Sequence, residues 1–246
     1  VYQEKGEVDF SYELPGVSRY RANYYKTIDG ITAAFRSIPT EIRSCEELNL
    51  PLTLNELAMQ PKGLVLVTGP TGSGKSTTLA AMMDYANRNR QDHIITIEDP
   101  IEFRHHHKGC LVSQREVGRD TQSFNTALRS ALREDPDIIM VGEMRDQESI
   151  QLALEAAETG HLVLSTLHTM SATKTVDRII EVFPGNLQAQ IRSGLSESIS
   201  AVISQTLFRR IDNMGEVVGR VAALEIMVAT NAVRALIRED NTHQLL

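Results

Sequence analysis

The sequence predicts an α/β protein in which a small N-terminal antiparallel sheet precedes a larger unit built on a parallel sheet. Three observations predict this fold class. The first forty residues contain runs that alternate polar and apolar side chains. From residue 63 onward, short apolar runs alternate with amphipathic helical segments, which is typical of parallel strands joined by crossover helices. A glycine-rich turn at 69–77 separates the first of these strands from the first helix.

The N-terminal part is expected to form three antiparallel strands. The alternating runs are 8–14, 19–25 and 31–38. Pro15-Gly16 and Asp29-Gly30 lie between them, and turn residues at this spacing predict a meander. Three strands rarely make an independent core, and the chain opens on Val1 rather than Met. We therefore expect an N-terminal part of this β domain to be missing.

A proline-marked segment is expected to link this sheet to the rest of the chain. Pro39, Pro51 and Pro61 punctuate it, and one short helix is predicted at 52–58. The predicted division is an N-terminal β domain at 1–48, a linker at 49–62 and an α/β domain at 63–246.

The α/β domain is expected to contain strands and helices in alternation. The core strands are predicted at 64–68, 93–98, 137–141 and 162–165. The helices are predicted at 75–90, 121–134, 146–159, 171–182 and 186–203, and a last short one at 231–239. A hairpin is predicted to pair 205–211 with 217–227 across the turn at 212–216.

Composition excludes several classes of protein. Of 246 residues, 41% are hydrophobic and 23% charged, which is ordinary for a soluble globular protein. The net charge of −7 argues against nucleic acid as a partner. No apolar run is long enough to span a membrane, and no signal peptide is visible. The isolated Cys45 and Cys110 suit a reducing cytoplasm and exclude a four-cysteine zinc site.

The glycine-rich turn carries the strongest chemical signal in the chain. It fits the pattern G-x-x-x-x-G-K-S/T, and it lies between a predicted strand and a predicted helix, as a P-loop (Walker A motif) requires. Its residues, all expected to bind ATP, are Gly69, Pro70, Thr71, Gly72, Ser73, Gly74, Lys75, Ser76 and Thr77. Lys75 is expected to reach the β- and γ-phosphates, and the Ser76 hydroxyl to ligate Mg²⁺. The turn therefore predicts a binding site for a nucleoside triphosphate.

Carboxylates follow two of the predicted strands. Strand 93–98 leads into the acidic stretch from Glu98 to Glu102, and strand 137–141 leads into Gly142-Glu143. Ligands bind beyond the carboxyl ends of strands in open α/β sheets, so Glu102 and Glu143 are candidate catalytic groups. Many ATPases have an Asp where Gly142 stands, which shifts the Mg²⁺-binding role to Glu143. The alternative is that these acids only solvate the ends of loops.

Two histidines flank the predicted strand 162–165. His161 and His168 are candidates to contact a γ-phosphate or to relay its presence, although a lone histidine at a strand end is more often structural. An extended strand would hold them roughly 20 Å apart. They therefore cannot both touch one phosphate unless the chain turns.

A run of three histidines, at 105–107, lies close to Cys110. These side chains could bind zinc, but the sequence offers no further ligand nearby. We expect this run to be an exposed loop.

Four motifs in order give the chain a family resemblance. The P-loop, the acidic box at 97–102, a Walker B-like segment at 135–143 and a histidine box at 159–169 resemble those of the secretion ATPases. That superfamily drives type II secretion, type IV secretion and type IV pili, and a glycine before the acidic residue is normal in it. The segments 142–146 and 232–239 are most similar to the PilT family of pilus-retraction ATPases. Val233 and Ala235 depart from the pattern of that family.

The resemblance implies a homohexameric ring whose subunits have a PAS-like N-terminal domain and a RecA-like ATPase domain, with ATP between them. It favours Glu102 as the base or water-orienting group and Glu143 as the group that helps to hold Mg²⁺ or the water. The reverse assignment of these two roles stays open. Arg19, Arg21 and Arg36 of the N-terminal sheet are implied to reach the γ-phosphate when the domains close. The alternative for each arginine is a solvated strand edge.

The function implied is Mg²⁺-dependent ATP hydrolysis that powers type IV pilus retraction and twitching motility. Two alternatives remain, an ATPase that serves a type II or type IV secretion system and a nucleotide-gated scaffold that is not a motor. The implied partner is a polytopic inner-membrane platform protein of the pilus. The implied location is cytoplasmic, at the inner face of the bacterial inner membrane and peripheral to it.

Overall fold

The structure of the chain, a computed structural model, describes residues 6–38 and 41–245. The N-terminal sheet has the predicted meander order β1-β2-β3, with both pairs antiparallel. Its strands are β1 (Glu7–Leu14), β2 (Ser18–Thr27) and β3 (Gly30–Ile38). The predicted N-terminal strands are therefore confirmed.

A second sheet of seven strands forms the centre of the molecule, in the order β10-β9-β4-β8-β7-β5-β6. Its strands are β4 (Gly63–Thr68), β5 (His93–Glu98), β6 (Leu111–Glu116), β7 (Ile138–Val141), β8 (Leu162–Leu167), β9 (Ile199–Ile211) and β10 (Val217–Val228). All neighbours run parallel except β10, which is antiparallel to β9. The predicted α/β class with a mainly parallel sheet is confirmed.

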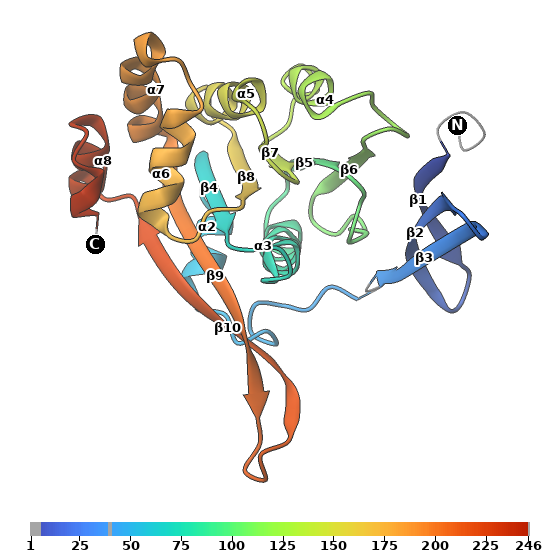
Figure 1. The fold of residues 1–246 in the computed structure, drawn as a ribbon. Helices are drawn as coiled ribbons and strands as arrows, with labels where there is room; N and C mark the ends of the chain where they lie inside the picture. The colour runs from blue at the N-terminus through green and yellow to red at the C-terminus, as the bar shows by residue number, and fades with distance from the viewer. Residues whose placement is uncertain (1–5, 39–40, 246) are drawn as a thin grey trace.

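Helices cover both faces of this sheet (Figure 1). They are α2 (Thr53–Ala58), α3 (Lys75–Asn89), α4 (Phe124–Ala131), α5 (Gln147–Glu158), α6 (Ala172–Glu181), α7 (Gly185–Ser198), α8 (Asn231–Arg238) and the short 3₁₀ helix η1 (Thr242–Gln244). Apolar residues of α4 to α7 form one core cluster, and those of α2 and α3 form the other. Successive residues of β4 alternate between the two, since Leu64 and Leu66 belong to the first cluster and Val65 and Val67 to the second.

Side-chain caps fix the starts of two helices that frame the site. Asp146 caps α5 and accepts a hydrogen bond from the backbone N–H of Ser149 at 2.8 Å. Ser171 caps α6 through the backbone N–H of Lys174 at 3.3 Å. Both helix starts agree with the sequence prediction, because a short polar side chain at this position satisfies an otherwise free backbone donor.

Two parts of the secondary-structure prediction are wrong. The predicted helix 186–203 ends at Ser198, and residues from Ile199 onward form the first part of β9. This part pairs with β4, and Val67 lies opposite Ile203 in the register. The strand β6, which the sequence prediction missed, is the outermost strand next to β5. The sheet thus has seven strands, counting the hairpin, where the sequence predicted four core strands and a separate hairpin.

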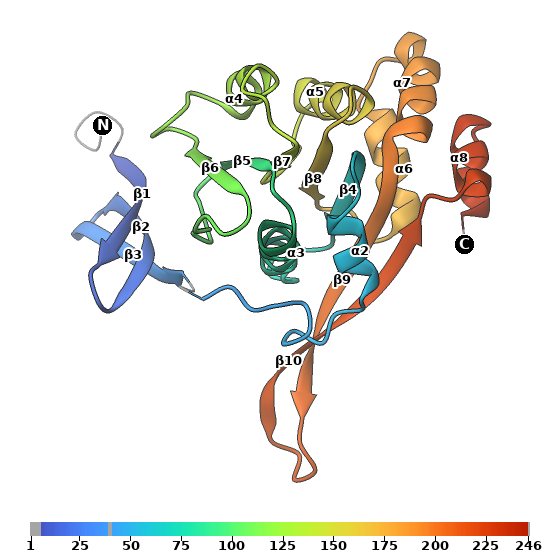
Figure 2. The same ribbon diagram turned by 180° about the vertical axis from the view of Figure 1, so that it is seen from behind.

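The N-terminal sheet lies beside the β6 edge of the central sheet (Figures 1 and 2). One of its faces carries a cluster of edge-to-face rings formed by Phe10, Tyr24 and Phe35. The other face carries polar side chains, and Ser11 from that face reaches the central domain through Glu116. The polar face is thus the one that contacts the central domain.

The segment between the two sheets also contributes to the core. Leu54, Leu57 and Ala58 of α2 are buried in the same cluster as α3, together with Cys45. Part of the predicted linker therefore packs against the larger domain. The division at 1–48, 49–62 and 63–246 stays a prediction.

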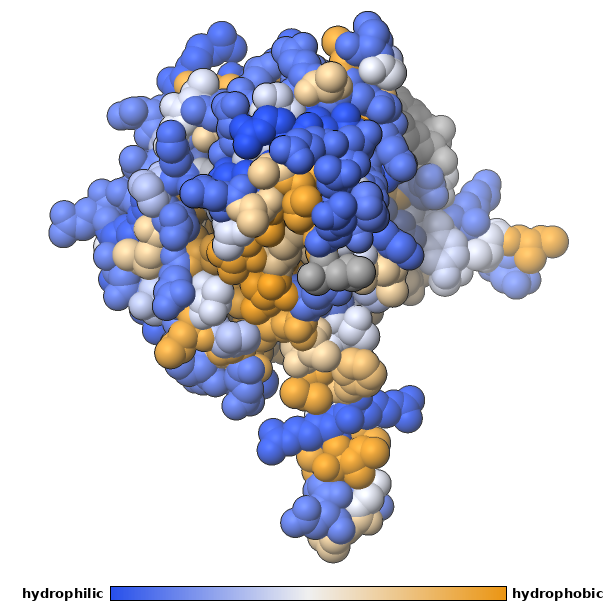
Figure 3. All heavy atoms as spheres, turned by 90° about the vertical axis from the view of Figure 1, so that its left-hand side faces the viewer, coloured by the Kyte–Doolittle hydropathy of each residue, from blue (hydrophilic) through white to orange (hydrophobic). Residues whose placement is uncertain are grey.

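The β9–β10 hairpin projects from the body of the molecule (Figure 1), and apolar side chains gather along it in the space-filling view (Figure 3). The exposed large apolar residues of the hairpin are Phe208, Ile211, Met214, Val217, Val218, Val221 and Val228. Within the described residues, every helix is too short or too polar to cross a membrane.

Candidate active site

The glycine-rich turn connects β4 to α3, as predicted. Gly69 follows the last residue of β4 with φ 135°, a backbone conformation that residues other than glycine rarely adopt. A Cβ atom on Gly69 would lie 2.2 Å from the backbone oxygen of Gln205. Gly74 precedes α3 with φ 91°, and a Cβ there would lie 2.8 Å from Nε2 of the same glutamine. The two glycines therefore allow the turn to pack tightly on β9.

The side chain of Gln205, on β9, supports this turn through hydrogen bonds. The sequence analysis did not identify this residue. The side chain is buried, and its Nε2 donates to the backbone oxygen of Ser73 at 2.7 Å. Its Oε1 accepts from the Thr78 hydroxyl at 2.7 Å. The position comes from the parallel pairing of β4 with β9, which sets Thr68 opposite Ser204. No local motif could have indicated this role.

Lys75 is buried at the start of α3. Its Nζ donates to the backbone oxygens of Gly69 at 3.0 Å and Pro70 at 3.2 Å. Burial lowers the pKa of Lys75, and the negative charges of Glu143 and Glu102 oppose that shift. The charges of the two carboxylates that the sequence singled out therefore act on this lysine.

The remaining residues of the turn lie around Lys75. Thr71 and Gly72 are exposed, and Ser76 is exposed in the first turn of α3, followed by the half-buried Thr77. Ser73 is buried, and its Oγ has no hydrogen-bond partner among the described residues. A helix N-terminus, a lysine and free hydroxyls at one turn make a site suited to phosphate.

Glu143 follows β7, with Gly142 between the strand and the carboxylate. Its Oε2 accepts from Nε of Arg145 at 3.0 Å, and its Oε1 lies 3.2 Å from Nε2 of His168. The Thr166 hydroxyl donates to the Gly142 oxygen at 2.7 Å and ties the end of β7 to β8. Glu143 and His168 therefore meet at the carboxyl end of the sheet.

His161 lies at the opposite end of β8. Its Nδ1 is 2.9 Å from the backbone oxygen of Ala156 and 3.3 Å from the hydroxyl of Thr159, in the turn that follows α5. Within one chain the structure does not bring His161 to the P-loop. The expectation that both histidines cannot meet one phosphate agrees with this arrangement, and a catalytic role of His161 stays a prediction.

The acidic box forms a loop between β5 and β6. Glu98 is buried, and its carboxylate accepts from the Thr96 hydroxyl at 2.7 Å and from Nε2 of Gln114 at 3.1 Å. Burial raises the pKa of Glu98 to about 7. The backbone N–H of Glu102 also donates to Glu98, at 3.3 Å, and the Glu102 side chain is exposed. Glu98 thus supports the loop from within, and Glu102 presents its carboxylate to the outside.

The histidine run after this loop is not uniformly exposed. His105 is buried, which lowers its pKa to about 4, while the next two histidines are exposed. The expectation of an exposed loop is therefore wrong for His105. Its backbone N–H donates a hydrogen bond to Oε1 of Gln114 at 2.7 Å, which holds this residue against β6. In the part of the chain that the structure describes, no group of three or more His, Cys, Asp or Glu side chains is arranged to hold a metal ion.

The three arginines of the N-terminal sheet occupy different surroundings. Arg19 Nη2 lies 3.6 Å from Glu116, Arg21 Nε lies 4.0 Å from Asp9, and Arg36 is exposed on β3 opposite Arg21.

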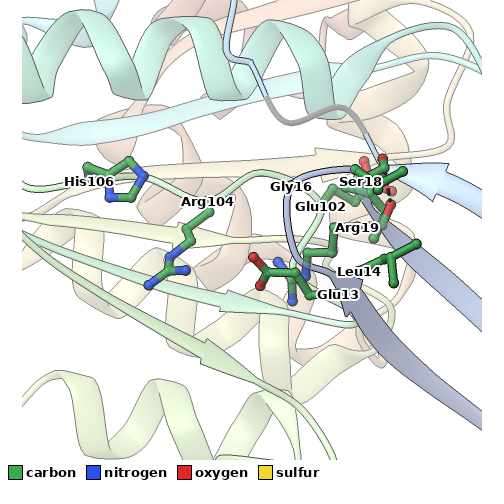
Figure 4. A pocket seen from close by; sticks show the side chains of 10 residues that line it. Glu13, Leu14, Gly16, Ser18, Arg19, Glu102, Arg104 and His106 are labelled. Atoms are coloured by element: carbon green, nitrogen blue, oxygen red, sulfur yellow. Dashed lines mark hydrogen bonds between the residues drawn. The ribbon is translucent and has the colours of Figure 1, made fainter.

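A pocket lies between this sheet and the acidic loop (Figure 4). Glu13, Gly16 and Arg19 line it from the β1–β2 side, and Glu102 and Arg104 line it from the loop. The structure thus brings Arg19 and Glu102 to one pocket, and the part of each arginine in catalysis stays a prediction.

A P-loop on a parallel sheet, with Lys75 at the start of α3 and the Glu143 carboxylate just beyond the end of β7, defines the class of the protein as a P-loop ATPase. Residues 44–246 match the family described as type II/IV secretion system protein. The chain therefore belongs to this family.

Individual relatives agree with that placement. The chain is 59% identical over 244 residues to the type IV pilus retraction ATPase PilT of Pseudomonas aeruginosa, which covers 99% of this chain and 70% of the relative. It is 57% identical over 245 residues to a twitching motility protein of Neisseria gonorrhoeae, which covers 100% of this chain and 64% of that relative. The chain thus spans about two thirds of the length of these curated relatives.

A solved structure has the same fold. The crystal structure of the pilus retraction motor PilT with bound ADP superposes with a TM-score of 0.94 at 52% identity, covering 99% of this chain and 70% of that one.

Proposed function

We propose that the chain is the motor part of an ATPase that powers type IV pilus retraction and twitching motility. The observation that carries the proposal is the P-loop with Lys75 at the start of α3, on which the charges of Glu143 and Glu102 act, in a chain that is 59% identical to a retraction ATPase. Hydrolysis of ATP needs charge neutralisation and a positioned water more than covalent chemistry. These three side chains supply both requirements.

The phosphates of ATP would lie against the backbone N–H groups of the P-loop and the start of α3. Lys75 would exchange the backbone oxygens of Gly69 and Pro70 for the β- and γ-phosphates. The exchange is favourable because a buried ammonium gains more from an anion than from neutral carbonyls.

The donors near the P-loop suit Mg²⁺. The Ser76 hydroxyl and the Glu143 carboxylate are hard oxygen ligands of the kind that this ion prefers. When bound, Mg²⁺ would neutralise charge on the phosphates. Ser76 and Glu143 are therefore the proposed metal-binding residues.

Glu102 and Glu143 divide the remaining work. Glu143 is held by Arg145 and His168, which suits a group that keeps one orientation. Glu102 is free of such partners among the described residues and faces the pocket that Arg19 also lines. We therefore assign the water-activating role to Glu102 and the Mg²⁺-binding or water-holding role to Glu143.

This assignment can be tested with Glu102→Gln and Glu143→Gln. Removal of a general base lowers turnover by about 100-fold or more while ATP still binds. We expect that pattern for Glu102→Gln, and for Glu143→Gln we expect a weaker response to Mg²⁺ in a titration of turnover. If turnover depended on the Mg²⁺ concentration in the same way in the unaltered chain, Glu102→Gln and Glu143→Gln, the assignment would be contradicted.

The proposed assembly is a homohexamer that is peripheral to the membrane, at the inner face of the inner membrane. Its proposed partner is a polytopic platform protein of the pilus. The net charge of −7 disfavours nucleic acid as a partner. Specific activity that rises with protein concentration would support a ring, and a constant specific activity in a demonstrably monomeric sample would count against it.

The second candidate is an ATPase that energises a secretion system, which the description of the family favours. Deletion of the gene in its host separates the two. Retraction predicts that surface pili are retained or increased and that surface motility is lost, with no rescue by Lys75→Ala. Unchanged pili and motility would instead support the secretion function.

The third candidate, a nucleotide-gated scaffold, predicts ATP binding without turnover. The two carboxylates whose charges act on Lys75 disfavour it. A measurable turnover that Lys75→Ala abolishes would exclude it.

A further inference from the structure

We propose that Glu116 is a positioning residue that couples the N-terminal sheet to the loop that carries Glu102. The inference rests on the ATPase function proposed above, because it concerns the placement of the group to which that function assigns water activation.

Glu116 is the last residue of β6, and its side chain is buried. Its Oε2 accepts from the backbone N–H of Ile101 at 3.1 Å, directly before Glu102. On its other side, the Ser11 hydroxyl donates to Oε1 at 3.1 Å, and Nη2 of Arg19 lies 3.6 Å from Oε2. One carboxylate thus contacts both the acidic loop and the N-terminal sheet.

The loop is held at consecutive positions on both sides of Glu102. Glu116 holds the N–H of Ile101, and Glu98 holds the N–H of Glu102 itself at 3.3 Å. Gln114 Nε2 donates to the backbone oxygen of Phe103 at 2.9 Å. The backbone around Glu102 is therefore fixed by side chains from the ends of β5 and β6, which lie in register with Glu98 opposite Glu116.

Of these three anchors, only Glu116 has a hydrogen bond to the N-terminal sheet among the described residues. Glu98 has partners in Thr96, Gln114 and the loop, and Gln114 has partners in Glu98 and the loop. A displacement of the N-terminal sheet would therefore reach the loop through Glu116.

The physical reason for the coupling is the cost of a buried charge. While the sheet is in place the carboxylate is 6% exposed, and protein donors take the place of water around it. If the sheet moves, Ser11 and Arg19 leave, and the carboxylate has to turn away from Ile101 to find new partners. Misplacement of a catalytic group by an ångström can lower a rate by about 100-fold. A moderate shift of Glu102 would thus change turnover without changing the P-loop.

The test compares Ser11→Ala, Glu116→Gln and the double variant in the full chain, with Glu148→Gln as the control. Glu148 is an exposed acid whose partners are Arg129 and Asn125, so the control repeats the chemical change at the surface. The measurements are kcat and KM for ATP, the melting temperature and the hydrogen exchange of the amides at 101–103.

We expect Glu116→Gln to lower kcat about tenfold and Ser11→Ala about threefold, with KM within about twofold of the starting protein. The double variant should be no slower than Glu116→Gln, because both changes break the same connection. Amide exchange should rise at 101–103 and stay unchanged across α3, at a constant melting temperature. A role confined to stability would lower the melting temperature and would not separate kcat from KM.

Unchanged kcat and exchange in Glu116→Gln would overturn the inference, and so would additive effects in the double variant. If the starting chain hydrolyses no ATP, the proposed function fails, and the exchange data still decide the coupling. Faster exchange at 101–103 in Ser11→Ala would then support it, and equal exchange would overturn it.

Discussion

His168 lies with its Nε2 atom 3.2 Å from Oε1 of Glu143, although the two residues are 25 positions apart in the chain and follow different strands. Gly142 and Thr166 make this meeting possible, since their 2.7 Å hydrogen bond joins the ends of β7 and β8. The pair fixes the direction of a carboxylate that also has Arg145 as a partner.

Loss of this partner should slow the reaction. His168→Ala leaves Glu143 free to follow Arg145 away from the phosphates, and we expect kcat to fall about tenfold, in the range seen when partners of ligating groups are removed. Steady-state ATPase kinetics and nucleotide binding would measure it. The exposed His243 offers a matched control, His243→Ala. Equal kcat in both variants would show that the pair has no role in turnover.

The brace under the P-loop should matter for both stability and affinity. Gln205→Leu leaves the Thr78 hydroxyl and the Ser73 oxygen without their partners, and an unpaired buried polar group costs about 1–3 kcal/mol. We expect the free energy of unfolding to fall by about 2 kcal/mol and the Kd for ATP to rise about tenfold. Denaturant unfolding and nucleotide titration would measure these effects. Gln190→Leu, at an exposed position of α7, is the control. A Gln205 variant that behaves like this control would show that Gln205 does not support the P-loop.

Glu98 should give the protein a distinct pH dependence of stability. Its pKa rises from 4.5 to about 7 in the folded chain, so between these values the native state holds a proton that the unfolded state has released. Stability then falls as pH rises through this window, by up to about 3 kcal/mol, and is level above it. In Glu98→Gln this fall should be absent.

Denaturant unfolding between about pH 4.5 and pH 8 would measure the difference. Glu148→Gln, a change of an exposed carboxyl, should keep the profile of the starting protein. Parallel profiles for the Glu98 variant and the starting protein would mean that Glu98 is not the group responsible.

The arginines of the N-terminal sheet give a prediction about domain closure. Arg36 is exposed on β3, so its loss should cost little stability. If it reaches the γ-phosphate in the closed state, Arg36→Ala should lower turnover at least about tenfold while nucleotide binding stays nearly intact. Lys26→Ala, an exposed cation at the end of β2, is the control. If Arg36→Ala turned over ATP as fast as this control, Arg36 would have no role in catalysis.

The sequence alone determined the parts of this protein whose chemistry is local. The P-loop is encoded in nine consecutive residues between an apolar strand and a helix, and backbone geometry follows directly from glycine spacing. The starts of α5 and α6 were also predictable, because a cap and its partner are three residues apart. The candidate carboxylates could be found as well, since strand ends in an open α/β sheet collect polar residues.

Only the tertiary structure decided which distant residues support that local chemistry. Residues 199–203 were predicted as the end of a helix, but they pair with β4 as a strand, and this pairing brings Gln205 against the P-loop. The edge strand β6 puts Glu116 between the acidic loop and the N-terminal sheet. β8 separates His161 from His168, so only the latter reaches Glu143. Each outcome depends on strand order and register. These arise from packing between segments far apart in the chain, so a local sequence pattern does not predict them.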